Sequence, residues 1–89
     1  MALQDELQAM AEDELGRACT MSWRALSKVV PWGDTFEGFI PSGRAVEVER
    51  NYVWANEAGG DVMAEVVVFQ NTVLYDQGAR VSRVIKKPA

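Results

Sequence analysis

Arg50 is the residue of this chain whose type and position most suggest chemistry. The segment 44–54 alternates between apolar and polar residues with a period of two, which predicts a β-strand with two different faces. Arg50 falls on the apolar face, between Val48 and Tyr52. Because a guanidinium group keeps its proton, the pattern predicts a permanent cation directed towards a core or a pocket.

Glu65 is the first-choice partner for Arg50. It lies among valines in the segment 62–69, which we expect to face the segment 44–54 across a hairpin. Two interpretations are open. In the first, the two residues form an ion pair that specifies the fold. In the second, burial raises the pKa of Glu65, which then acts as a general acid or base beside an Arg50 that binds an anion.

Aromatic side chains accompany this pair. Tyr52 and Trp54 share the face of Arg50, and with Glu65 they complete a candidate ligand-binding set. Tyr75 could extend the aromatic stripe. Strand-spaced aromatics beside valines serve either core packing or ligand stacking, and both roles are open here.

Several chemistries lack the groups they need. The chain has no histidine, so Ser-His-Asp and Cys-His nucleophiles and the usual zinc ligand sets cannot be built within it. Its glycines do not match phosphate-binding loops, and its carboxylates do not form a calcium loop. We therefore expect no cofactor and no metal site, and no catalytic residue is assigned. Cys19 is the one cysteine, which rules out an internal disulfide and fits a reducing compartment.

Charge argues against two classes of partner. The formal net charge is −4, whereas nucleic acids and anionic membranes are bound mainly through Lys and Arg. The charges are unevenly distributed, and the two ends could attract each other within one subunit or between two. Residues 1–16 carry Asp5, Glu6, Glu12, Asp13 and Glu14 without a base, and residues 77–89 carry Arg80, Arg83, Lys86 and Lys87 without an acid.

No apolar run approaches the ~20 residues that span a bilayer, and the N-terminus lacks the pattern of a signal peptide. We therefore expect no membrane contact and a cytoplasmic location.

Residues 2–30 follow a helical period, with acids leading and bases following as the helix dipole prefers. Gly16 and Thr20 are weak helix formers, so the region forms one long helix or two helices that meet there. Pro31 ends the region in either case. Glu14 interrupts the apolar stripe.

Trp23 lies on the polar side of the helical region, so something is expected to cover it: another segment of this chain or a second subunit. Trp32 also needs cover, and both are candidate interface residues. Trp32 belongs to the segment 31–43, which is rich in Pro, Gly and aromatics. That segment predicts an ordered loop, with a short edge strand at 35–40, that acts as a core cap or as a lid over a site.

Strand and turn signals fill the rest of the chain. The segment 55–61 predicts a hairpin connection, and 62–69 is apolar on both faces, which predicts a central strand covered on each side. Further turns are predicted at 70–71 and 76–78. A short strand is predicted at 72–75, and the last strand is predicted at 80–85.

The sequence therefore predicts a single α+β domain, residues 1–89, with an N-terminal helical region (one long or two short helices) packed on a three- to four-stranded antiparallel meander. The expected function is a small self-associating interaction protein, a homodimer without catalytic activity. The alternative is a small-ligand-binding domain or minor enzyme, with a pocket between helix and sheet that uses Arg50 and Glu65 for a small anionic ligand.

Overall fold

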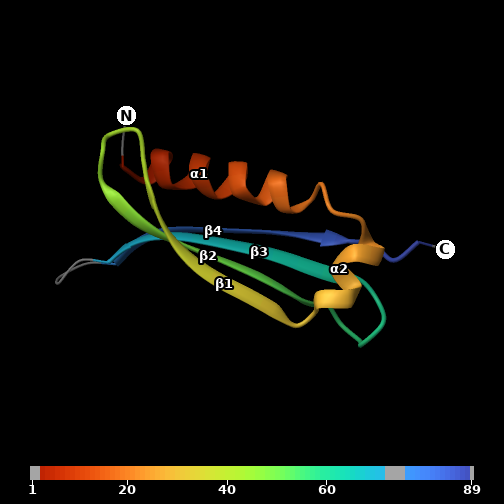
Figure 1. The fold of residues 1–89 in the computed structure, drawn as a ribbon. Coiled ribbons are helices and arrows are strands. Elements are labelled where there is room, and N and C mark those ends of the chain that lie inside the picture. The colour runs from red at the N-terminus through yellow and green to blue at the C-terminus, as the bar shows by residue number, and fades with distance from the viewer. Residues whose placement is uncertain (1–2, 72–75, 89) are drawn as a thin grey trace.

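The computed structural model describes residues 3–71 and 76–88, and it shows two helices packed on an open four-stranded antiparallel sheet (Figure 1). The strand order β1-β2-β3-β4 follows the chain, which confirms the predicted α+β meander. The elements are α1 (Leu3–Ala18), α2 (Trp23–Val29), β1 (Trp32–Phe39), β2 (Ala45–Trp54), β3 (Val62–Asn71) and β4 (Asp76–Ile85).

The helical region consists of two helices rather than one. After α1, the Thr20 hydroxyl donates a hydrogen bond to the Arg17 carbonyl at 2.7 Å, which satisfies an acceptor at the helix end. Ser22 then caps α2, because its side chain accepts a hydrogen bond from the Ala25 amide at 3.2 Å. No helix among residues 3–71 and 76–88 is long and apolar enough to cross a membrane.

β1 is longer than the edge strand that the sequence predicts. The segment 31–43 is predicted to be mainly a loop, but most of it pairs with β2. The pairing runs from Trp32, opposite Tyr52, to Phe39, opposite Ala45. Its two glycines concealed the alternation, because they provide no side chain to either face. Asp34 consequently occupies a defined position in the sheet.

The turns predicted at 70–71 and 76–78 are wrong. β3 continues through Asn71, and β4 begins at Asp76. Gly78 lies opposite Phe69, and a Cβ at Gly78 would approach the Phe69 Cβ to 3.1 Å. This glycine therefore makes room for a cross-strand aromatic side chain instead of forming a turn. The strand predicted at 72–75 falls outside the described residues.

The hydrophobic core lies between the sheet and the helices. α1 runs across β3 and β4, and its apolar side chains meet one face of the sheet (Figure 1). Residues of both the helices and the sheet are fully buried here, so solvent is excluded from this face. They include Leu7, Leu26, Val48, Val62, Val66 and Val68.

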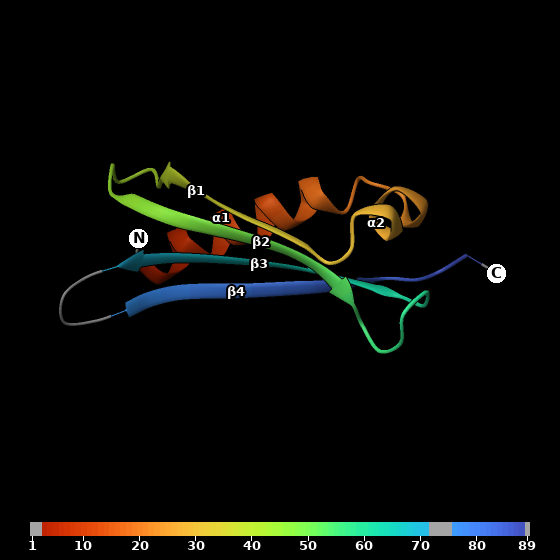
Figure 2. The same cartoon turned by 60° about the horizontal axis from the view of Figure 1, so that its bottom comes forward.

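No described helix or strand covers the other face of the sheet. Figure 2 turns it towards the viewer, with α1 behind the strands. Along β3, buried Val66 and Val68 alternate with half-buried Met63, Val67 and Phe69. The prediction that 62–69 is central is confirmed, but the prediction that both of its faces are covered is wrong for the described chain. One layer of helices can cover only one side of an open sheet.

Candidate functional site

Arg50 is paired with Asp34 of the neighbouring strand. The two residues are cross-strand partners, and the Arg50 Nε donates a hydrogen bond to Asp34 Oδ1 at 2.8 Å. A second bond joins Arg50 Nη2 to Asp34 Oδ2, so the contact is bidentate. The hydrogen bond from Arg50 lowers the pKa of Asp34 below its ordinary value. The same hydrogen bond raises the pKa of Arg50, although partial burial opposes the shift.

The predicted Arg50–Glu65 pair is wrong. The β2–β3 register places Val66 opposite Arg50 and Asn51 opposite Glu65, so Glu65 lies on the opposite face of the sheet. A shift of one residue in register exchanges the two faces, and sequence alone does not determine the register of this hairpin. Glu65 instead lies near Arg80, with 3.8 Å between Oε2 and the Arg80 Nε.

A signal for Asp34 was present in the sequence. Trp32, Asp34 and Phe36 alternate with other residues at the spacing of one strand face. A full strand over this segment, placed beside the segment 44–54, makes Asp34 a competitor of Glu65 as the partner of Arg50.

Aromatic rings and a second carboxylate surround the guanidinium of Arg50. Its Cζ lies 5.5 Å from the Trp32 ring centroid and 4.9 Å from that of Phe36, within cation–π range. Glu14 of α1 places Oε2 at 3.9 Å from Arg50 Nη1 and accepts a hydrogen bond from Arg17 at 3.1 Å. Glu14, the polar residue in the apolar stripe, is therefore neutralised by two arginines.

The other predicted ligand-binding residues are occupied in packing. Tyr52 is buried and its ring stacks on Trp32 at 5.1 Å between centroids. Burial raises the pKa of the Tyr52 phenol. Trp54 is half-buried against the core. Among the described residues, no buried side-chain nitrogen or oxygen lacks a hydrogen-bond partner. The buried polar atoms of the cluster are therefore all hydrogen-bonded, as in a structural network.

Trp23 is covered by its own chain. Its Nε1 donates a hydrogen bond to the Gly60 carbonyl at 2.9 Å, and the Lys87 Nζ lies 5.7 Å from its ring centroid. The Asp61 carboxylate accepts a hydrogen bond from the Lys87 amide at 2.8 Å, which fixes the C-terminal segment beside Trp23. Of the two candidate interface residues, Trp23 is half-buried and Trp32 is 37% exposed.

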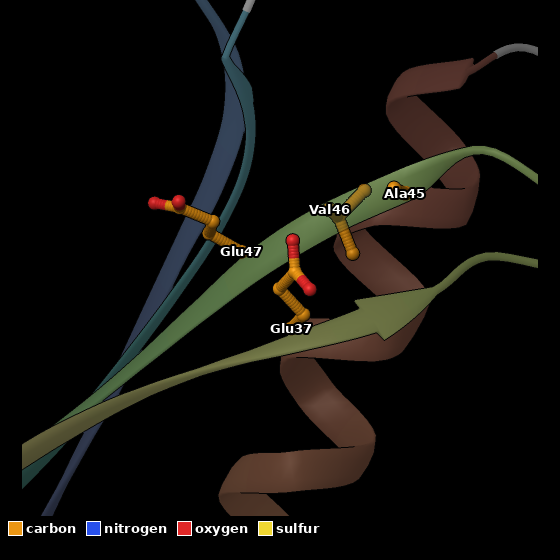
Figure 3. Close-up of a pocket in the computed structure, with 4 residues that line it drawn as sticks. All are labelled: Glu37, Ala45, Val46 and Glu47. Atoms are coloured by element: carbon orange, nitrogen blue, oxygen red, sulfur yellow. The ribbon is translucent and has the colours of Figure 1, made fainter.

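A surface hollow of about 180 Å³ lies at one end of β1 and β2. It is lined by Glu37, Ala45, Val46 and Glu47. Glu37 and Glu47 are cross-strand partners, and Figure 3 shows the Glu47 side chain extending away from the Glu37 carboxylate. The hollow contains none of the predicted ligand-binding residues, and no metal-binding group of three or more ligands occurs in the part of the chain that the structure describes.

The side of the sheet that no described helix covers is here called the open face. Its apolar residues lie mainly on β3, and its carboxylates lie mainly on β1 and β2. The large apolar members are Phe39, which is 71% exposed, Val53, Met63, Val67, Phe69 and Val84. The charged members are Glu37, Glu47, Glu49, Glu65 and Arg80.

Comparison of the chain with protein-family models, curated proteins and solved structures found no match. Function must therefore be inferred from the geometry of the chain itself.

Proposed function

We propose that this protein is a self-associating interaction domain, and that two copies pack against each other through their open faces. The observation that carries the proposal is the set of apolar side chains on that face. Met63, Val67 and Phe69 of β3 are uncovered by any described element, and Val53 and Val84 flank Met63. A polar row of Asn51, Glu65 and Ser82 separates Met63 from Val67 on this face, so the apolar residues form two groups. Apolar surface of this kind on a small domain is typical of an interaction site.

The size of the open face fits a dimer interface. Strands of 8 or 10 residues, at roughly 3.3 Å per residue and about 4.8 Å between strands, give a face of about 19 by 33 Å. That is roughly 600 Å² before side-chain relief is counted, close to the ~800 Å² per partner of a standard interface. Two sheets packed face to face are a common two-layer arrangement.

The alternative function, a small-ligand pocket that uses both Arg50 and Glu65, has little support from their placement. The two residues lie on opposite faces, and the Arg50 guanidinium is already bound by Asp34. We place the self-associating domain in the cytoplasm, because Cys19 has no internal partner, as expected in a reducing compartment.

The test is the mass of the protein in solution, measured by light scattering at a protein concentration on the order of tens of micromolar. We expect twice the chain mass of 9.9 kDa for the wild type. Val67→Asp should give the monomer mass, because it replaces an apolar side chain of the open face with a charge that the dimer would bury. Val29→Asp is the matched control, since Val29 is an exposed valine on α2 and its replacement should leave the dimer intact.

Circular dichroism and a urea titration of each variant check that it remains folded. A wild-type protein with the monomer mass would contradict the proposal. So would a folded Val67→Asp variant that keeps the dimer mass.

A further inference from the structure

The open face is electrically asymmetric across its strands. Three carboxylates lie on β1 and β2: Glu37, Glu47 and Glu49. The cation Arg80 lies on β4, at the opposite edge of the sheet, and its side chain is 71% exposed. Its one described ion-pair contact is the 3.8 Å approach to Glu65, so its charge is largely available to a second molecule.

A dimer formed by two copies of one face has a two-fold axis in the plane of the interface. An axis perpendicular to the strands lays each strand over its own copy. That arrangement stacks the acidic half of one face on the acidic half of the other. An axis parallel to the strands lays β4 over β1 of the second copy and β3 over β2. Arg80 of β4 then faces the strands that carry the carboxylates of the second copy.

A cross-strand row is the set of residues that lie opposite one another on the four strands. The parallel axis places each row over the same row of the second copy, so the strand register shows which residues meet. One row consists of Thr35, Glu49, Val67 and Arg80. Arg80 then lies over Thr35 of the second copy, beside Glu49, and their long side chains can meet across the ~10 Å between stacked sheets. In the row that holds Val53 and Met63, each of these residues meets the other across the interface.

We infer that the open faces pair about a two-fold axis parallel to the strands, with Arg80 of each copy against Glu49 of the other. This inference rests on the proposed function, and it adds the orientation of the second copy and the ion pair that selects it. No carboxylate of the open face lies directly over another carboxylate in this arrangement, which removes the repulsion that the perpendicular axis creates.

Charge reversal tests the orientation. In a dimer of the Arg80→Glu variant, the new glutamate of each copy faces Glu49 of the other copy. In a dimer of the Glu49→Arg variant, the new arginine of each copy faces Arg80 of the other copy. Each variant should dimerise at least about tenfold more weakly than the wild type, because like charges are juxtaposed. Mixing the two variants should restore the dimer, since both contacts of the mixed dimer then join Arg to Glu. Glu12→Arg, an equal charge change on the exposed side of α1, is the control and should leave the dimer intact.

Sedimentation measures the dissociation constants, and native mass spectrometry identifies the mixed dimer. Restoration on mixing supports the parallel axis. Single reversals that leave dimerisation unchanged or tighten it, or a mixture no more dimeric than its components, overturn it. If Val67→Asp abolishes the dimer while mixing restores nothing, the open face is the interface and only the orientation is wrong. A wild-type monomer overturns both proposals.

Discussion

Replacing Asp34 with alanine removes the bidentate contact that holds Arg50 in the sheet. Asp34 is 34% exposed and Arg50 is 29% exposed, so the pair is neither buried nor free in solvent. The nearest remaining carboxylate is Glu14, whose oxygen lies 3.9 Å from the guanidinium. Glu14 limits the cost of leaving Arg50 without Asp34.

The expected magnitude lies between two limits. Hydrogen bonds to charged groups contribute about 1.5–3 kcal/mol, whereas exposed ion pairs contribute about 0–1 kcal/mol. For a pair that is about one-third exposed, we expect Asp34→Ala to lower the free energy of unfolding by about 1–2 kcal/mol. Arg50→Ala should cost about 2–4 kcal/mol, because it also removes the contacts with Trp32 and Phe36.

A double-mutant cycle isolates the pair. Urea unfolding of the wild type, both single variants and the double variant, followed by tryptophan fluorescence, should give a coupling free energy of about 1–2 kcal/mol. All four proteins are compared at one concentration, because dimerisation adds to apparent stability. Asp13→Ala is the control. Asp13 pairs with Arg17 at 2.9 Å, but the side chains are 67% and 70% exposed, so its effect should be at most about 0.5 kcal/mol.

The pH dependence has a definite sign. The hydrogen bond from Arg50 lowers the pKa of Asp34 in the folded protein from its ordinary value of 3.8. The stabilisation is therefore complete above that value and is lost as the pH falls through the lower folded-state pKa. The stability difference between wild type and Asp34→Ala should shrink in acid below about pH 4. A coupling free energy near zero at neutral pH, or a difference that grows in acid, would refute this account of the cluster.

Two further predictions concern the backbone. A Cβ at Gly16 or Gly43 meets no atom within 4 Å, but Gly43 has a φ of +92°. In urea unfolding, Gly16→Ala should therefore stabilise the protein by about 0.5–1 kcal/mol, whereas Gly43→Ala should destabilise it by about 1 kcal/mol; equal effects of one sign would contradict this. In hydrogen exchange, the amides of Val66 and Val67 should be the most protected, because β3 is paired on both sides. Faster exchange there than in the edge strand β1 would show that the sheet opens from its centre.

The local patterns of the sequence predict much of the fold. The helical period over 2–30 corresponds to α1 and α2, the alternation over 44–54 to β2, and the apolar run over 62–69 to β3. These patterns are legible because a helix or strand repeats its faces with a fixed period, whatever it packs against. The same alternation places Arg50 on the core face of β2, where the structure has it.

The partner of each side chain was decided only by the tertiary structure. Asp34 reaches Arg50 through the β1–β2 register, and Glu65 is carried to the other face by the β2–β3 register. Trp23 is covered by Gly60 and Lys87, which lie 37 or more residues away along the chain. Register and cover depend on which distant segments meet, and periodicity holds no information about that. The open face was also decided by the tertiary structure. Apolar residues on both sides of β3 predict a covering layer on each side, but the described helices form one layer on one side only.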